Sequence, residues 1–174
     1  MCCGEEVMEK LRTENKDVKE ACFKEITGKD KPEKSQHHRR PFDPFDCEKM
    51  EQKRNEMMCV HQCFGQKLKY IDEDGNVIPE EYTKFLKEKL SSAKYLEPVQ
   101  DEIITGCLED IQNVMDNNKS TGKCKPSGIS SEFCLFKQII LNCPDDQMKD
   151  KDVCKKMQER LKQGKDFFPP PPNH

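Results

Sequence analysis

The chain has 174 residues, of which 36% are charged and only 33% are hydrophobic, and it contains no tryptophan. Because an ordinary globular chain has an apolar share of about 45–50%, packing alone would give this chain a thin core. The net charge of -3, with both signs interspersed, argues against a nucleic-acid-binding protein, and the sequence contains no apolar run near the roughly 18 residues of a membrane span.

Amphipathic helices are predicted along most of the chain, and strand patterns are nearly absent. The first helix spans 5–25, where apolar side chains recur at three-, four- and seven-residue spacings behind an acidic first turn. A polar, proline-containing linker follows at 28–44, and a second helix runs from Cys47 to about Tyr70. Residues 71–79 form a turn. Four further helices are expected at 79–92, 99–115, 129–141 and 147–162.

The eleven cysteines give this polar chain a second source of stability. A zinc site is not indicated, because the sequence has no Cys-x2-Cys pair and its four histidines are not in metal-binding register. His61 stands between Cys59 and Cys63, but on a helix it would face away from both. A thioredoxin-type redox enzyme would also need the Cys-x2-Cys pair. We therefore expect an all-α domain of about six to eight short helices, joined by disulfides in an oxidising compartment.

Two features concern secretion and assembly. The opening residues lack the apolar stretch of a signal peptide, so we expect the signal of a secreted, extracellular protein to have been removed. The sequence Asn118-Lys119-Ser120 is a glycosylation motif that agrees with secretion. Because eleven is odd, at least one cysteine is free or pairs with another chain, which leaves both a monomer and a homodimer open.

The cysteine spacing resembles that of the insect odorant-binding protein family. Cys59-x3-Cys63 is followed after 43 residues by Cys107, and later by Cys134-x8-Cys143. The segment 72–77 is similar to the loop that the family carries after its third cysteine. The resemblance covers about residues 47–154, and Cys22 extends it.

A narrower resemblance is to the Plus-C subgroup of that family. The subgroup adds a cysteine nine residues before the fifth, a proline after the sixth and a further cysteine about ten residues later. This sequence has Cys124-x9-Cys134, then Cys143-Pro144 and Cys143-x10-Cys154.

The disulfide pairing that the family connectivity implies joins the first cysteine to the third, the second to the fifth and the fourth to the sixth. The first cysteine could be Cys22 or Cys47, and we favour Cys22 because it follows a first helix. Cys124 and Cys154 are then left as a further pair, and Cys47 would pair with Cys2 or Cys3. The implied bonds are Cys22–Cys63, Cys59–Cys134, Cys107–Cys143 and Cys124–Cys154.

The resemblance implies a domain with an apolar cavity that crosslinks hold open. Each aromatic or aliphatic side chain would be ordinary core by itself, but as a set they suit a ligand cavity, with tyrosine hydroxyls to orient the ligand. The candidate ligand-binding residues are Phe64, Leu68, Tyr70, Tyr82, Phe85, Leu86, Leu90, Tyr95, Leu96, Ile104, Leu108, Ile111, Leu135, Phe136, Ile139 and Ile140.

Calcium-binding and enzymatic sites are not indicated. The run Asp72-x-Asp74-x-Asn76 begins like an EF-hand loop, but its sixth position is Val77 and its twelfth is Thr83, where glycine and glutamate are required. The sequence has no Gly-x-Ser-x-Gly elbow for a hydrolase and none of the motifs of a secreted phospholipase. We expect no catalytic residue, no metal ion and no cofactor.

The function predicted from these residues is reversible carriage of a small hydrophobic ligand, such as an odorant or pheromone, through extracellular fluid to an olfactory receptor. The alternative is a secreted, disulfide-linked interaction protein with a filled core that binds a protein partner. We expect one folded domain with three segments: an N-terminal helix and linker at 1–46, a family-like helical core at 47–143, and a C-terminal helix with a proline-rich tail at 144–174.

Ligand release is predicted to involve the tail and one histidine. The segment 166–169 would fold over the cavity mouth, and His61 would titrate near neutral pH.

Overall fold

The computed structural model describes residues 2–30, 47–118 and 122–164, so the predicted linker and proline-rich tail lie largely outside the described residues. Within these ranges the regular structure is helical, apart from an isolated antiparallel bridge between Ile71 and Val77. The all-α fold class is therefore confirmed. The elements are α1 (Glu5–Glu14), α2 (Lys16–Thr27), α3 (Cys47–Lys67), α4 (Pro79–Leu90), the 3-10 helix η1 (Lys94–Val99), α5 (Gln100–Asp116), α6 (Ser127–Leu141) and α7 (Lys151–Lys162).

The single helix predicted over 5–25 is wrong, because the chain breaks at Asn15. The backbone there has φ -117° and ψ 17°, and the Asn15 side-chain amide donates a hydrogen bond of 3.0 Å to the carbonyl of Leu11. Asparagine competes for backbone hydrogen bonds in this way, so it favours helix ends over helix interiors. The result is two shorter helices, α1 and α2.

The start of α4 follows the sequence signals closely. Pro79 occupies the first turn, where its missing N–H costs nothing, and Glu80 and Glu81 complement the positive end of the helix dipole. The preceding turn is held by the Asp72 carboxylate, which accepts a 2.8 Å hydrogen bond from the Asn76 amide, and by Gly75 at φ 81°. These local features fix the direction in which α4 leaves α3.

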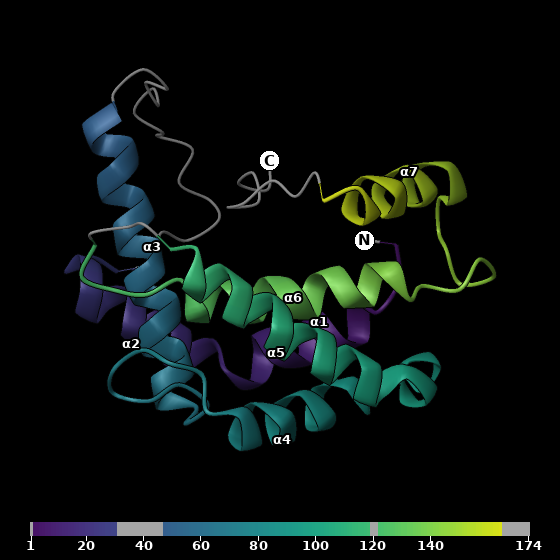
Figure 1. The fold of residues 1–174 in the computed structure, drawn as a ribbon, viewed down its shortest axis with the longest axis horizontal. Helices are drawn as coiled ribbons and strands as arrows, with labels where there is room; N and C mark the ends of the chain where they lie inside the picture. The colour runs from purple at the N-terminus through teal and green to yellow at the C-terminus, as the bar shows by residue number, and fades with distance from the viewer. Residues whose placement is uncertain (1, 31–46, 119–121, 165–174) are drawn as a thin grey trace.

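Helix α6 runs through the middle of the molecule, with α3 crossing its N-terminal end, α5 packed alongside it and α7 near its C-terminal end (Figure 1). Its residues are mostly apolar, and its first turn is buried against α3. There is no room for a side chain at Gly128, because a Cβ there would come within 2.7 Å of the Gln62 backbone nitrogen. The close approach of these two helices depends on that glycine.

Two groups of buried side chains hold the molecule together. The larger, the main core, draws on every element from α1 to α6. Its buried members are Val7, Leu11, Cys22, Val60, Cys63, Phe64, Tyr70, Ile71, Tyr82, Leu86, Leu90, Ala93, Leu96, Ile103, Ile104, Cys107, Ile111, Cys134, Leu135 and Ile139. The smaller, the terminal core, joins the N-terminus to α7 and consists of Cys2, Cys3, Ile140, Cys143, Met148 and Cys154.

Five disulfides join ten of the eleven cysteines, and the side chain of the eleventh, Cys47, lies outside the described residues. Cys22–Cys63 links α2 to α3, as the family resemblance implies. The other four bonds are Cys2–Cys154, Cys3–Cys143, Cys59–Cys124 and Cys107–Cys134.

The remaining implied pairs, Cys59–Cys134, Cys107–Cys143 and Cys124–Cys154, are wrong. Packing of the start of α6 on α3 brings Cys124 to Cys59, with Cα atoms 5.1 Å apart, and the amide of Lys125 donates a 2.8 Å hydrogen bond to the Gln62 side chain. Cys134, further along α6, then bonds to Cys107 on α5.

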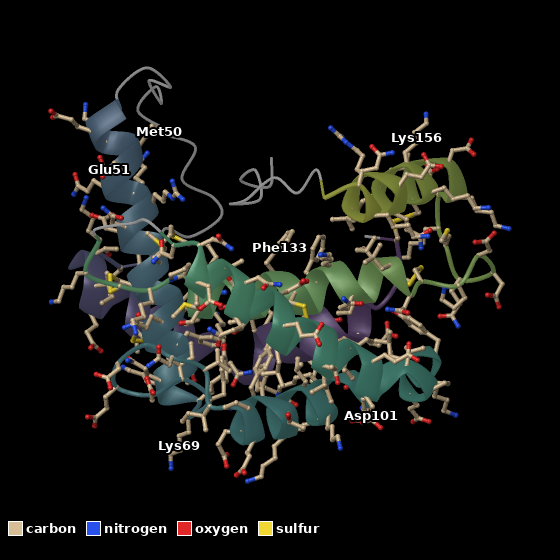
Figure 2. The ribbon with its side chains drawn as sticks, in the orientation of Figure 1. Met50, Glu51, Lys69, Asp101, Phe133 and Lys156 are labelled. Carbon is tan, nitrogen blue, oxygen red and sulfur yellow. A yellow bond between two sulfur atoms is a disulfide. The ribbon has the colours of Figure 1, made fainter. Side chains whose placement is uncertain are left out.

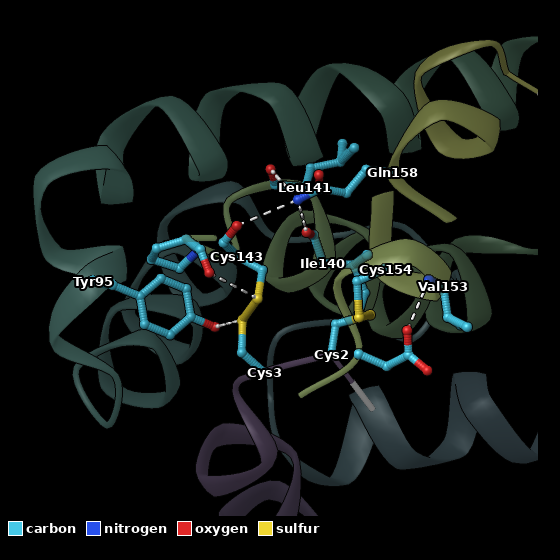
Figure 3. Close-up of a disulfide and its surroundings, with 11 residues drawn as sticks. Cys2, Cys3, Tyr95, Ile140, Leu141, Cys143, Val153, Cys154 and Gln158 are labelled. Carbon is cyan, nitrogen blue, oxygen red and sulfur yellow. Dashed lines mark hydrogen bonds between the residues drawn. A yellow bond between two sulfur atoms is a disulfide. The ribbon is translucent and has the colours of Figure 1, made fainter. Parts of the chain in front are cut away.

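The expected pairing of Cys47 with Cys2 or Cys3 is also wrong. Cys2 and Cys3 take the two C-terminal cysteines, Cys154 and Cys143 (Figure 3). The resemblance could not place these bonds, because its matched spacing begins well after the two N-terminal cysteines.

The terminal core is closed by hydrogen bonds as well as by its two disulfides. The Gln158 side-chain amide donates to the carbonyl of Ile140 at 2.9 Å, which ties α7 to the end of α6 (Figure 3). Asp150 caps α7 by accepting a 3.1 Å hydrogen bond from the amide of Val153. Helix α7, which begins four residues later than predicted, is thereby fixed at both its start and its middle.

Candidate functional site

Fourteen of the sixteen candidate ligand-binding side chains meet in or against the main core. They come from α3, α4, η1, α5, α6 and the turn after α3, so residues far apart in sequence share one apolar interior. Ten are buried members and four are partly buried side chains packed against them: Phe64, Tyr70, Tyr82, Leu86, Leu90, Leu96, Ile104, Ile111, Leu135 and Ile139, with Leu68, Phe85, Tyr95 and Leu108.

The other two candidates, Phe136 and Ile140, belong to the terminal core instead. They lie on the face of α6 directed at α7, because Ile140 is one residue further round the helix than Ile139. Sequence periodicity showed that α6 is apolar on more than one side, but it could not assign each side to a neighbour. Tyr95 contacts both cores and connects them.

Three aromatic rings form the centre of the candidate site. Tyr70 follows α3, whereas Tyr82 and Phe85 stand one turn apart on α4. The centroid of the Tyr70 ring is 4.7 Å from that of Phe85 and 5.5 Å from that of Tyr82. Both separations lie within the 4.5–7 Å range over which aromatic rings attract each other.

The hydroxyls of the three tyrosines differ in their partners. Tyr82 donates a 2.9 Å hydrogen bond to the carbonyl of Ser131, and the Tyr95 hydroxyl lies 3.3 Å from the Cys3 sulfur. The Tyr70 hydroxyl has no hydrogen-bond partner among the described residues. Burial raises the pKa of all three, to about 12 for Tyr95, so each remains a neutral phenol that can donate a hydrogen bond.

A buried charge cluster lies beside the main core and was not predicted from the sequence. The Glu132 carboxylate on α6 accepts hydrogen bonds from Lys19 of α2 at 2.7 Å and from the His61 Nδ1 of α3 at 2.5 Å. Burial alone would raise the pKa of Glu132, but the charge and hydrogen bonds of His61 and Lys19 outweigh it and lower the pKa to about 2. This carboxylate is therefore ionised at all physiological pH values.

One signal in the sequence points to this cluster. Glu132 is the only acidic residue of α6, and it stands in a predominantly apolar segment. A lone acid there calls for a buried partner, because an unpaired buried charge is very costly. Its partners could not be identified without the fold, since they are far from it in the chain.

The tail segment 166–169, which was predicted to fold over the cavity mouth, lies outside the described residues. His61, the other part of that prediction, is held in the charge cluster with only 8% of its surface exposed. The enclosed apolar cavity expected around the candidate residues stays a prediction.

Two shallow depressions mark the described surface. The larger, of about 560 Å³, is open to solvent and is lined by Gln66, Lys69, Ile71, Asp72, Glu73 and Ile78. The other, of about 450 Å³, lies against the first turns of α5 and is lined mainly by acidic residues. The larger depression borders Tyr70 on both sides in sequence, through Lys69 and Ile71, but its own lining is mixed.

Many charged side chains point into solvent around the outline of the molecule (Figure 2). Among the described residues, no helix is both long and apolar enough to cross a membrane. The same ranges contain no cluster of three or more histidine, cysteine or acidic side chains placed to hold a metal ion.

A comparison with family models places residues 4–126, more than two thirds of the chain, in the PBP/GOBP family. The matched region contains α1 to α5, the three aromatic rings and both partners of the Cys22–Cys63 and Cys59–Cys124 bonds. Neither the curated proteins nor the solved structures contain a significant match to the chain.

Proposed function

Because the chain belongs to the PBP/GOBP family of insect odorant-binding proteins, we propose that it is an extracellular carrier of odorants, pheromones or similar semiochemicals. Members of this family are binding proteins without enzymatic activity, and in general they carry small hydrophobic ligands. The family and the five disulfides together indicate a secreted protein.

Within the family, we propose that the chain belongs to the Plus-C subgroup. The spacing Cys124-x9-Cys134, the Cys143-Pro144 pair and the later Cys154 support this assignment. Five disulfides, two more than the classic three of the family, also agree with it. The two bonds that reach Cys2 and Cys3 are the part that the subgroup pattern does not include.

The observation that carries the proposal is the convergence of fourteen candidate side chains on one apolar core whose helices are joined by three disulfides. Cys22–Cys63 fixes α2 to α3, Cys59–Cys124 fixes the start of α6 near α3, and Cys107–Cys134 fixes α5 to α6. A ligand that enters this core exchanges water for apolar contacts, at about 25 cal/mol per Å² of apolar surface buried. No covalent step is involved, so binding is reversible.

The alternative function, a filled-core interaction protein, would need a continuous exposed apolar surface. The exposed large apolar side chains of the described residues are divided among α3, α5 and α7. Met50 on α3 and Lys156 on α7 mark two helices that lie at opposite ends of the molecule (Figure 2). This separation favours the carrier over the interaction protein.

The test is a titration of the oxidised full-length protein with the apolar fluorescent probe N-phenyl-1-naphthylamine. We expect saturable binding at micromolar concentration or tighter, and displacement by volatile apolar compounds. The matched control is the same titration of protein that has been reduced and alkylated. This protein should lose binding, because disulfides no longer hold the helices around the core. Absence of saturable binding in the oxidised protein would contradict the carrier function.

A further inference from the structure

Tyr70 and Tyr82 are the two fully buried tyrosines of the main core. One edge of the Tyr70 ring lies against the backbone of α3. A Cβ at Gly65 would come within 2.9 Å of the ring carbon Cε2, so the glycine makes room for the ring. The rings of Tyr82 and Phe85 border it from α4. The hydroxyl is thus held by packing at a defined place.

That hydroxyl is a buried polar group without a partner among the described residues. Leaving such a group unpaired costs about 1–3 kcal/mol, and the great majority of buried polar groups avoid this cost. Tyr82 makes the contrast clear, because its hydroxyl is buried in the same core and donates to Ser131. The unpartnered hydroxyl of Tyr70 is therefore the feature that calls for a partner beyond the described residues.

Two serines, Ser92 and Ser130, also have unpartnered hydroxyls, but they do not carry the same argument. Ser130 lies in α6, where a serine can rotate its hydroxyl onto the carbonyl four residues earlier, as Ser131 does with Ser127 at 2.7 Å. Ser92 lies in the turn after α4, and its short side chain stays beside its own backbone carbonyls. The phenol of Tyr70 stands at the far end of a rigid ring and cannot reach its own backbone. Of the three unpartnered hydroxyls, the Tyr70 hydroxyl is therefore the one that a bound ligand would have to satisfy.

On the basis of the proposed carrier function, we propose that the Tyr70 hydroxyl donates a hydrogen bond to the ligand. The ligand class is a small, neutral, mainly apolar molecule with one hydrogen-bond acceptor, such as a ketone, aldehyde or ester. The aliphatic part would contact the surrounding leucine and isoleucine side chains, and the acceptor would lie at the aromatic centre. A pocket that is apolar except for one placed polar group selects ligands in this way.

The burial of the Tyr70 hydroxyl and the nearby negative charge of Glu132 favour a neutral ligand. Burial and the negative charge of Glu132 both raise the pKa of Tyr70, which shows that a negative charge at this hydroxyl is unfavourable. A carboxylate ligand would meet the same two costs. Fatty acids are therefore expected to bind less well than neutral carbonyl compounds of the same length.

The experiment compares three ligands of equal chain length as competitors of N-phenyl-1-naphthylamine: 2-decanone, decane and decanoate. In the unaltered protein, 2-decanone should displace the probe at lower concentrations than decane or decanoate. Tyr70→Phe removes only the hydroxyl and should weaken 2-decanone about five- to tenfold while leaving decane unchanged. Ser131→Ala is the control, because it removes a buried hydroxyl that already has a partner, the Ser127 carbonyl, and that is not among the candidate ligand-binding side chains; it should preserve the preference for the ketone.

Three results would overturn the inference. The first is an equal affinity of the unaltered protein for the ketone and the alkane, and the second is an unchanged ketone preference in Tyr70→Phe. Both leave the carrier function in place, because the probe still binds. The third is absence of probe binding in the unaltered protein, which removes the carrier function and the inference with it. Circular dichroism and probe affinity of each variant verify that it is folded.

Discussion

The main core and the terminal core are held together by different means. The main core buries large aromatic and aliphatic side chains from six α-helices and η1, and three disulfides lie within or at its edge. The terminal core has six buried residues, four of which are cysteines joined in two disulfides. One region relies on packing with crosslinks added, and the other relies mainly on crosslinks.

This difference coincides with the limits of the family match. Residues 4–126 include most of the main core, whereas Cys2, Cys3, Cys143 and Cys154 all lie outside them. Both disulfides that fix α7 and the end of α6 to the N-terminus thus lie outside the matched residues. In a protein with so few apolar residues, crosslinks supply the attachment that a second hydrophobic core would otherwise provide.

The largest expected effect comes from truncating a side chain in each core. Leu86 and Met148 are both buried, and mutation of either to alanine removes three heavy atoms. Leu86→Ala should lower the free energy of unfolding by about 2–5 kcal/mol, because it leaves a cavity among closely packed neighbours. Met148→Ala should lower it by less than half as much, because disulfides still hold its neighbours together.

Urea denaturation of the oxidised variants measures both values. The mutation Val153→Ala, at an exposed site on α7, is the control and should change stability very little. Equal losses for Leu86→Ala and Met148→Ala would contradict the contrast between the two cores.

Removal of one disulfide from each core should give the next largest effect. With Cys3–Cys143 intact, the Cys2–Cys154 bond closes a loop on the order of a dozen residues, so its loss costs about 3 kcal/mol in the chain-entropy model. We expect the double variant Cys2→Ala/Cys154→Ala to lose this stability in α7 alone. Amide hydrogen exchange of α7 should rise roughly a hundredfold while that of α4 stays unchanged.

The matched variant is Cys107→Ala/Cys134→Ala, which removes a bond inside the main core. It should raise amide exchange in α4, α5 and α6 together. Parallel loss of protection in α4 and α7 after removal of Cys2–Cys154 would show that the two cores are not separate units.

Removing the charge of the buried cluster should lower the free energy of unfolding by an intermediate amount that depends on pH. Glu132 has a folded-state pKa of about 2, below its ordinary value of 4.5, so its contribution is fully present above pH 4.5 and is lost as the pH falls toward 2. Glu132→Gln should lower the free energy of unfolding at pH 7 by about 2–3 kcal/mol. The difference from the unaltered protein should shrink below pH 4.5 and vanish near pH 2.

The comparison variant is Asp145→Asn, which breaks the exposed Asp145–Lys155 ion pair next to the terminal core. Exposed ion pairs contribute little, so we expect a much smaller loss at pH 7. Denaturation curves between pH 2 and pH 7 measure both variants. A pH-independent loss in Glu132→Gln would show that its charge is not the source of the stability.

The smallest expected effect is the difference in stability between removing the Tyr82 hydroxyl and removing the Tyr70 hydroxyl. Tyr82→Phe removes a hydrogen bond to Ser131 and should lower the free energy of unfolding by about 1 kcal/mol. Tyr70→Phe removes an unpartnered hydroxyl and should leave stability in the absence of ligand unchanged or slightly higher. Thermal unfolding of the ligand-free variants measures the difference, and a larger loss in Tyr70→Phe would mean that its hydroxyl already has a partner.

The helices were predictable because each signal is local. Pro79 and its following acids marked the start of α4, and the apolar run before Pro144 marked α6. The sequence did not reveal the break at Asn15, because the amphipathic pattern continues through it. The helix ends there because the Asn15 side-chain amide, in place of a backbone N–H, donates to the Leu11 carbonyl.

The disulfide pairing was only partly predictable, because pairing depends on which helix faces touch. A shift of α6 along α3 decides whether Cys59 meets Cys124 or Cys134, and no spacing in the sequence records that shift. The candidate site shows the same limit. Hydrophobic periodicity found the residues of the main core, but the unpartnered state of Tyr70 and the partners of Glu132 depend on long-range contacts.

The most direct test of the carrier account is a crystal structure of the oxidised protein with 2-decanone bound. If the chain is such a carrier, one ligand should lie inside the main core, with its carbonyl oxygen about 2.7–2.8 Å from the Tyr70 hydroxyl oxygen. A ligand that lies only in the surface depression beside Lys69, or a main core that stays closed at saturating ketone, would contradict it.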